Sequence, residues 1–198
     1  MKNLLLLFFT ICFLSHSGNQ NVFAQSDAPK VEVGAHYTLL GFSEFDTTDS
    51  GVGARLTFNL TNSFAVEGEF NFFPEKRRHF IEPFYINSQR YQGVFGAKYG
   101  MRKDKFGIFA KLRPGFIRFS EGPIDPSIRT LVAVPNTFRS TEVILDWGGV
   151  FELYLSRHTM LRFDVGDTII FFGNSTVSNN PGFTSHNVQL NIGFGFRF

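Results

Sequence analysis

Cysteine is almost absent from this sequence. Its one cysteine, Cys12, lies in an N-terminal apolar segment that we expect to be removed. The mature chain then has neither a disulfide nor a thiolate ligand, which excludes a small disulfide-stapled protein and a cysteine-type zinc site. Cys12 also lacks the small-residue context of a bacterial lipid-attachment site, so the sequence does not predict a lipoprotein.

A strong charge of one sign is missing as well. The chain has 19 Lys and Arg against 17 Asp and Glu, a formal net charge of +2, so nucleic acid is not an expected partner. After the N-terminal segment, no apolar run reaches the ~20 residues that a membrane helix needs. Phe is nevertheless abundant, with 27 residues. Many aromatic residues without long apolar runs favour alternating strands over helices.

The N-terminal segment has the pattern of a secretory signal. Lys2 precedes an apolar run over residues 4–14, and a polar stretch then leads to Val22, Phe23 and Ala24. We predict a signal peptide over residues 1–24 and a short periplasmic segment over residues 25–29. The alternative is a buried helix of a cytosolic domain.

The chain ends in the sequence NIGFGFRF, in which every second residue is apolar. A period of two is typical of a strand with one apolar and one polar face. The apolar face comprises Val188, Leu190, Ile192, Phe194, Phe196 and Phe198. Seven earlier segments have the same period, and they cover residues 30–41, 51–60, 64–73, 91–102, 105–118, 141–155 and 159–171. Three apolar residues, Val94, Phe109 and Ile144, fall on the polar side of this pattern.

The connections between these segments alternate in length. Residues 61–63, 103–104 and 156–158 are short enough for hairpin turns, whereas long polar connections are expected over 42–50, 74–90, 119–140 and 172–185. Short turns at one end, long loops at the other and an even number of strands are typical of an outer-membrane barrel. We therefore predict an all-β, eight-stranded antiparallel up-and-down transmembrane β-barrel over residues 30–198. It is expected to be a monomer in the bacterial outer membrane, with both termini in the periplasm.

A soluble barrel of the lipocalin type is the alternative, with its apolar side turned inward around a ligand. Its polar side would face water, whereas here that side is rich in glycine and carries charges of both signs. These features fit a narrow lumen in which charges pair. The parity of the short hairpins places Arg55 opposite Glu69, and Glu152 opposite Arg162, as lumen ion pairs.

The C-terminal pattern resembles that of the eight-stranded outer-membrane barrel family, which includes the OmpA transmembrane domain and OmpX. The resemblance covers residues 30–198. It implies that Phe194, Phe196 and Phe198 form a signal read by the outer-membrane barrel assembly machinery. OmpA-type proteins often continue into a peptidoglycan-binding domain; this sequence stops at the barrel, so no tethering role is expected.

The sequence offers weak signals for chemistry. Ser185 and His186 are neighbours on a strand and point to opposite faces, as do Asp164 and Asp167, so neither pair is expected to form a catalytic or cation site. No metal or cofactor is predicted. Residues Lys76, Arg77 and Arg78, in the second expected loop, are a candidate contact for lipopolysaccharide phosphates, and a solvated loop cluster is the alternative. We expect a structural or surface-interaction protein rather than an enzyme, with a lumen plugged by ion pairs. A lipid A-modifying enzyme and a narrow channel are the alternatives.

Overall fold

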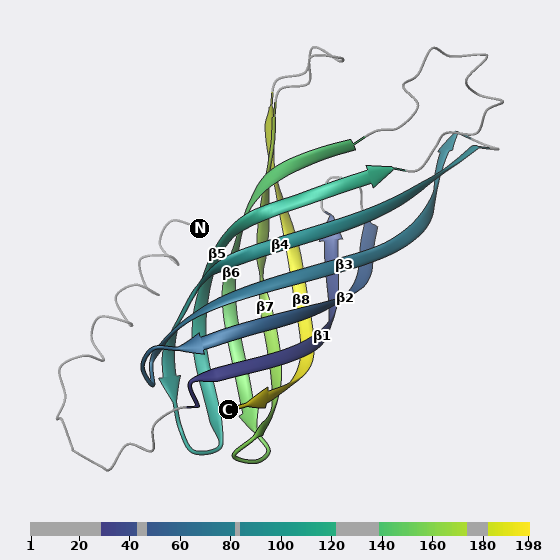
Figure 1. Ribbon diagram of the computed structural model, residues 1–198. Coiled ribbons are helices and arrows are strands. Elements are labelled where there is room, and N and C mark those ends of the chain that lie inside the picture. The colour runs from purple at the N-terminus through teal and green to yellow at the C-terminus, as the bar shows by residue number, and fades with distance from the viewer. Residues whose placement is uncertain (1–28, 43–46, 82–83, 122–138, 174–181) are drawn as a thin grey trace.

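The computed structural model describes residues 29–42, 47–81, 84–121, 139–173 and 182–198. It contains eight strands: β1 (Val31–Phe42), β2 (Thr47–Asn59), β3 (Phe64–Ile81), β4 (Phe84–Arg102), β5 (Phe106–Glu121), β6 (Arg139–Tyr154), β7 (Thr159–Phe172) and β8 (Phe183–Arg197). Each strand pairs with the next, and β8 pairs with β1 to close the barrel (Figure 1). The predicted eight-stranded antiparallel barrel is confirmed. The predicted signal peptide lies outside the described residues.

Short turns join β2 to β3, β4 to β5 and β6 to β7 at the end of the barrel where the C-terminus lies (Figure 1). Side-chain hydroxyls shape two of them. The Thr61 hydroxyl accepts hydrogen bonds from the N–H groups of Ser63 and Phe64, at 3.2 and 2.9 Å. The Ser156 hydroxyl does the same for His158 and Thr159, at 3.1 Å each. Tight turns of this kind fix the register of the strands that they join.

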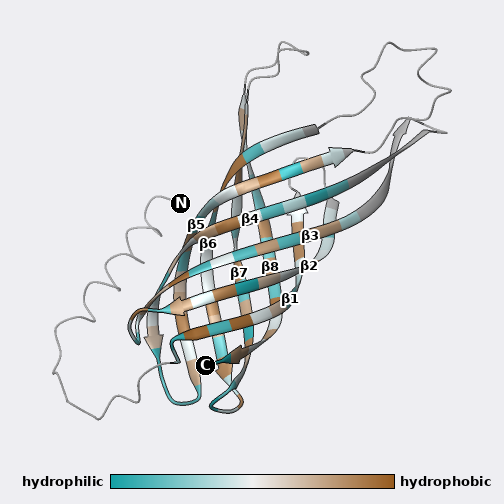
Figure 2. Ribbon diagram, viewed as in Figure 1, coloured by the Kyte–Doolittle hydropathy of each residue, from teal (hydrophilic) through white to brown (hydrophobic). Residues whose placement is uncertain are grey.

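Along each strand, side chains alternate between the outside and the lumen. On β4, Phe95 is 66% exposed whereas Lys98 is fully buried. Figure 2 shows the alternation as bands of hydrophobic and hydrophilic residues along the strands. The exposed face is apolar and the buried face is largely polar, the reverse of a soluble barrel. Within the described ranges, no helix is long and apolar enough to cross a membrane.

The prediction of a long loop over residues 74–90 is wrong. β3 continues to Ile81 and β4 begins at Phe84, and the two remain paired along this extension, with two register shifts. The strands also extend into the other three expected loops (Figure 1). Outside the hydrocarbon both faces of a strand can meet water, so apolar and polar residues no longer need to alternate. This loss of alternation made paired strands look like loops in the sequence.

The barrel closes where its first and last strands meet. Val31 and Phe198 exchange two backbone hydrogen bonds: the Val31 N–H donates to the Phe198 oxygen at 3.2 Å, and the Phe198 N–H donates to the Val31 oxygen at 2.8 Å. The ladder continues from Glu32↔Arg197 to Phe42↔Asn187. A closed ladder leaves no free sheet edge, which a membrane-embedded sheet requires.

Candidate functional site

The lumen contains a cluster of buried charges that comes from all eight strands. We call these residues the charged cluster: Glu32, Arg55, Glu67, Glu69, Lys98, Lys111, Arg113, Asp146, Glu152, Arg162, Asp164 and Arg197. None of them is more than 6% exposed. Cations and anions are interleaved, so each charge has at least one opposite charge within ion-pair distance. Buried charges are tolerated only when they are paired in this way.

Both pairs named from the sequence lie at the registers that hairpin parity predicts. Arg55 is the backbone partner of Glu69, with its Nη1 3.4 Å from the Glu69 Oε2. Glu152 is the partner of Arg162, with 3.6 Å between the Glu152 Oε1 and the Arg162 Nη1. These contacts are among the longer ones in the cluster. Some of the shorter contacts, such as those of Glu67 with Arg113 and Arg162, join strands that are not neighbours.

Arg162 makes its shortest contacts with Glu67 and Asp164. It donates two hydrogen bonds to the Glu67 carboxylate, at 2.8 and 2.9 Å, and two to Asp164, at 2.7 and 2.9 Å. Glu67 is on β3 and Arg162 is on β7, so this contact crosses the lumen. Sequence reasoning missed it because parity identifies only the partners on adjacent strands.

Arg113 links three carboxylates from two sides of the lumen. Its Nη1 lies 2.9 Å from both Glu67 and Glu69 on β3, and its Nε donates to Asp146 on β6 at 2.7 Å. Glu69 therefore has a shorter contact with Arg113 than with its predicted partner Arg55. The guanidinium has five donors in a planar fork, which suits it to bind several carboxylates at once.

Part of the charged cluster lies toward the short-turn end, where Arg102 joins it. Lys98 contacts Glu152 closely and lies 3.4 Å from Glu32. Arg102 also approaches Glu32, at 3.3 Å, and donates to the Tyr154 hydroxyl at 2.9 Å. The Arg197 guanidinium lies 3.9 Å from the centre of the Tyr154 ring. These contacts join β1, β4, β6 and β8 close to the point where the barrel closes.

A layer of uncharged polar side chains adjoins the charged cluster. The Gln92 amide donates to the Gln189 side chain at 3.0 Å, and Asn71 donates to both Gln92 and Glu69, at 2.9 and 3.0 Å. The His36 Nε2 lies 2.6 Å from the Asn71 side-chain oxygen. A Cβ on Gly53 would overlap the His36 ring and the Asn71 amide, so glycine provides the room for this layer.

An apolar layer lies beyond the amides, and we keep this name for six buried residues. They come from six strands: Leu40, Phe73, Val94, Ile117, Ile144 and Ile170. Phe119 and Phe172 pack against them. The Phe73 ring lies against Gly51 on β2, where an added Cβ would come within 2.8 Å of it. Val94 and Ile144, which broke the alternating pattern in the sequence, are thus lumen residues of this layer.

The outer face carries one His–Asp contact among the residues that the structure describes. The His186 Nδ1 lies 2.6 Å from the Asp167 Oδ2, and the other Asp167 oxygen accepts the Asn187 N–H at 2.8 Å. Ser185 is buried and His186 is exposed, so the two point to opposite faces as predicted. Asp164 and Asp167 likewise point to opposite faces of the barrel wall. No group of three or more His, Asp or Glu side chains in the described ranges is arranged to hold a metal ion.

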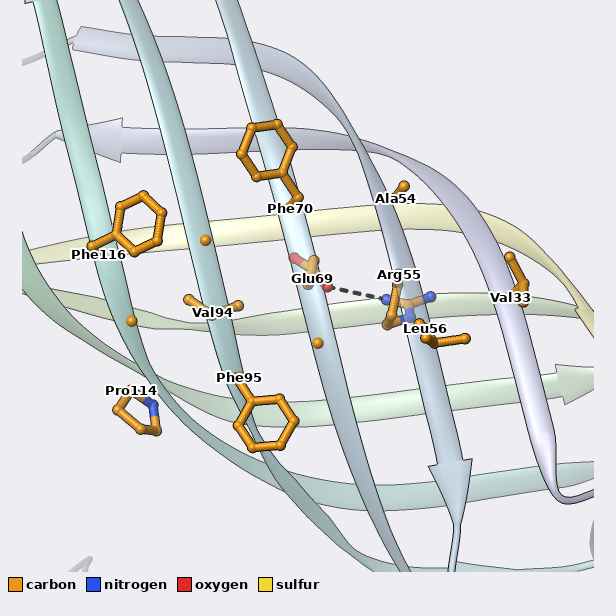
Figure 3. A pocket seen from close by; sticks show the side chains of 13 residues that line it. Val33, Ala54, Arg55, Leu56, Glu69, Phe70, Val94, Phe95, Pro114 and Phe116 are labelled. Atoms are coloured by element: carbon orange, nitrogen blue, oxygen red, sulfur yellow. Dashed lines mark hydrogen bonds and ion pairs between the residues drawn. The ribbon is translucent and has the colours of Figure 1, made fainter.

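An apolar depression of about 670 Å³ lies on the outer face of β1 to β5. Phe70, Phe95 and Phe116 surround it, and glycines of β3 and β4 lie between them (Figure 3). The Arg55–Glu69 ion pair lies directly behind its floor, on the lumen side of the wall. Exposed aromatic side chains around a small-residue floor form a groove in the barrel surface.

The structure describes the two other sets of predicted residues to different extents. The side chains of Lys76, Arg77 and Arg78 lie outside the described residues, although their backbone belongs to β3 and pairs with β4. Phe194, Phe196 and Phe198 lie on the outer face at the end of the chain. The Phe194 and Phe196 rings pack edge to face, with 5.2 Å between their centres.

Comparison with known proteins places this barrel in a family. A family model described as the outer membrane protein beta-barrel domain matches residues 9–198. No curated protein sequence matches the chain.

Several solved structures share the fold. A major outer membrane protein from Thermus thermophilus aligns with a TM-score of 0.55 and 12% identity, over 85% of this chain and 99% of that one. OprG from Pseudomonas aeruginosa aligns with a TM-score of 0.53 and 14% identity, over 87% and 97%. Ail of Yersinia pestis, in complex with the heparin analogue sucrose octasulfate, aligns with a TM-score of 0.50 and 11% identity, over 87% and 99%. At these identities, the likeness concerns the fold alone.

Proposed function

The chain belongs to the outer membrane protein beta-barrel domain family and is an integral outer-membrane protein, and from this premise we propose that it is a closed barrel with a structural or surface-interaction role. The observation that supports a closed barrel is the content of its lumen. The charged cluster and the apolar layer occupy successive levels inside the same eight strands. An eight-stranded barrel is just wide enough for side chains to fill.

The two levels oppose permeation for different physical reasons. An ion that enters the charged cluster must displace an existing partner from a buried carboxylate or guanidinium, which is costly. An ion that reaches the apolar layer must lose its water, because apolar constrictions exclude water from a pore. We therefore favour a closed barrel over the narrow channel, and we place the protein's role at its surfaces.

A planar-bilayer recording tests this proposal. The purified protein is expected to insert without producing conductance steps. Its folded state is checked by the difference in gel mobility between unheated and boiled samples. Reproducible steps from folded protein would favour the channel instead.

For the surface role, we propose that the β3–β4 extension contacts lipopolysaccharide through Lys76, Arg77 and Arg78. The support is the placement of three consecutive cationic residues on a strand extension opposite the short-turn end (Figure 1). Phosphates are strong acceptors for such cations. The similar Ail structure contains a sulfated sugar, and a polyanion is the same class of ligand.

This contact can be measured with a charge-matched control. Replacing Lys76, Arg77 and Arg78 by Gln is expected to weaken binding of purified lipopolysaccharide to the barrel in detergent. Replacing the exposed Lys103, Lys105 and Arg157, at the opposite end, by Gln is expected to leave binding unchanged. Equal binding by both variants would contradict the proposed contact.

A lipid A-modifying enzyme is the second candidate, and the His186–Asp167 contact on the outer face favours it. A carboxylate that holds a histidine ring is a recurring part of acid–base sites. Against an enzyme, the neighbouring Ser185 is buried in the lumen and does not share the outer face with His186.

A further inference from the structure

The groove on the outer face has a regular origin in the register of β2 to β5. Across neighbouring strands, Ala54 is opposite Phe70, Phe70 is opposite Gly93, and Gly93 is opposite Phe116. In the next row, Leu56 is opposite Gly68, and Gly68 is opposite Phe95. Large and small residues therefore alternate along both rows. The small residues form a floor between aromatic side chains that stand out from the wall.

The wall is also irregular at this place. The paired positions between β4 and β5 omit Phe95 and Gly96, which lie opposite Pro114 and Arg113. Proline has no N–H to give to a ladder, so it interrupts the pairing of a central strand. Phe95 and Pro114 both line the groove. The groove and the interrupted ladder thus coincide.

The rim is formed by side chains that protrude from the barrel. Phe70, Phe95 and Phe116 are 50%, 66% and 46% exposed. A second barrel has a convex wall, which would reach the floor only with single side chains and leave apolar space between them. Empty apolar space loses dispersion contacts. A flexible hydrocarbon chain can lie between the rings and reach the floor.

We propose that this groove binds one acyl chain of an outer-membrane lipid at a defined position on the barrel. The groove opens onto the apolar outer surface of the barrel, which contacts the hydrocarbon. An acyl chain is therefore the ligand that the groove meets in the membrane. The groove is a shallow depression, open along its membrane side, with a volume of about 670 Å³. Binding at this site does not depend on whether the lumen is closed.

Native mass spectrometry can test the site with glycine substitutions on two faces. Gly68→Leu fills the groove, and an added Cβ there has its nearest atom, on the Phe95 ring, at an ordinary 3.7 Å. Gly149→Leu is the matched control, since Gly149 is on β6, outside the groove, with nothing within 4 Å of an added Cβ. Ala54→Leu fills the groove from β2 and serves if Gly68→Leu does not fold.

The probe is palmitoyl-oleoyl phosphatidylethanolamine added to protein extracted in detergent from outer membranes. The parent and Gly149→Leu are expected to retain one lipid after the detergent is removed. Gly68→Leu and Ala54→Leu are expected to retain about tenfold less, equivalent to ~1.4 kcal/mol of binding free energy. Equal retention by all four proteins, or no retention by the parent, would overturn the proposal. A dimer lost only in the groove variants would assign the groove to a second copy instead.

Discussion

Arg162 on β7 and Glu67 on β3 are joined across the lumen by two hydrogen bonds of 2.8 and 2.9 Å. The two strands are not neighbours in the sheet, so this contact ties opposite sides of the barrel wall together. Arg113 approaches the same Glu67 carboxylate at 2.9 Å. Glu67 is therefore a shared anion for two buried guanidinium groups.

Removing Glu67 is expected to destabilise the barrel strongly. Glu67→Ala leaves two buried cations with fewer partners, and breaking a buried pair on one side costs ~3–5 kcal/mol. Adding Arg162→Ala should recover part of the loss, because residues in one ion-pair network couple by ~0.5–3 kcal/mol. Urea unfolding in lipid vesicles measures both variants. Lys103→Ala, in an exposed turn, is the control, and additive losses in the double variant would contradict the coupling.

The sequence predicted contacts between adjacent strands better than contacts across the lumen. Arg55 and Glu69 follow from the side-chain period and a short turn, both of which are local. The Arg162–Glu67 contact depends on how far each strand is staggered around the closed barrel. No local pattern in the sequence indicates that stagger. Arg102 and Tyr154 were missed for the same reason, because their shared contact joins strands that are not adjacent.

The outline of the fold was predictable because the membrane imposes a strict rule. Between the two interfaces, one face of each strand must be apolar, so the alternation shows in the sequence. Residues 74–90 lie beyond this constraint, and there the prediction of a loop was wrong. The groove was not predicted either. It arises from which small and large residues become cross-strand neighbours, as with Gly68 and Phe95.

A charged side chain on the outer face should lower the stability of the barrel more, the deeper it lies in the bilayer. Phe58 and Phe163 are exposed on that face. Phe163 lies well inside β7, and Phe163→Arg is expected to lower the free energy of unfolding by ~2–4 kcal/mol, the cost of Arg near the bilayer midplane. Leu60→Arg, next to the turn between β2 and β3, should cost only ~0–1 kcal/mol. Equal stability of Phe163→Arg and the parent in vesicles would contradict the outward, lipid-facing placement of Phe163.

The two levels in the lumen should act as barriers in series. Arg113→Ala disturbs the charged cluster but leaves the apolar layer intact, so we expect no conductance steps. Replacing Ile117 and Ile144 by Ser hydrates the apolar layer but leaves the charged cluster, and this variant should also stay silent. The combination of all three substitutions is expected to conduct. Steps from Arg113→Ala alone would show that the apolar layer does not seal the barrel. Gel mobility before and after boiling confirms that each variant is folded.

The outer His186–Asp167 contact separates the structural role from the enzymatic one. If the protein is not an enzyme, His186→Ala leaves the lipid A of overexpressing cells unchanged, and the parent does not alter it relative to cells without the protein. Mass spectrometry of extracted lipid A measures both. A modification that appears with the parent and disappears with His186→Ala would favour the enzyme.

The terminal Phe198 should matter more for assembly than for stability. Its side chain is 71% exposed on the outer face, and withdrawing an aromatic side chain from water contributes at most ~1.5–3 kcal/mol. Deleting the residue also removes its two backbone hydrogen bonds with Val31, at a net ~0.5–1.5 kcal/mol each. The truncated chain is therefore expected to fold in detergent with a modest loss of stability. In cells, where we propose that the assembly machinery reads this residue, it should accumulate in the periplasm or be degraded. Phe198→Ala separates the two effects, because it keeps the backbone hydrogen bonds and loses only the ring. If Phe198→Ala reaches the outer membrane at parental levels, as measured by cell fractionation, the ring acts only as one more lipid-facing side chain.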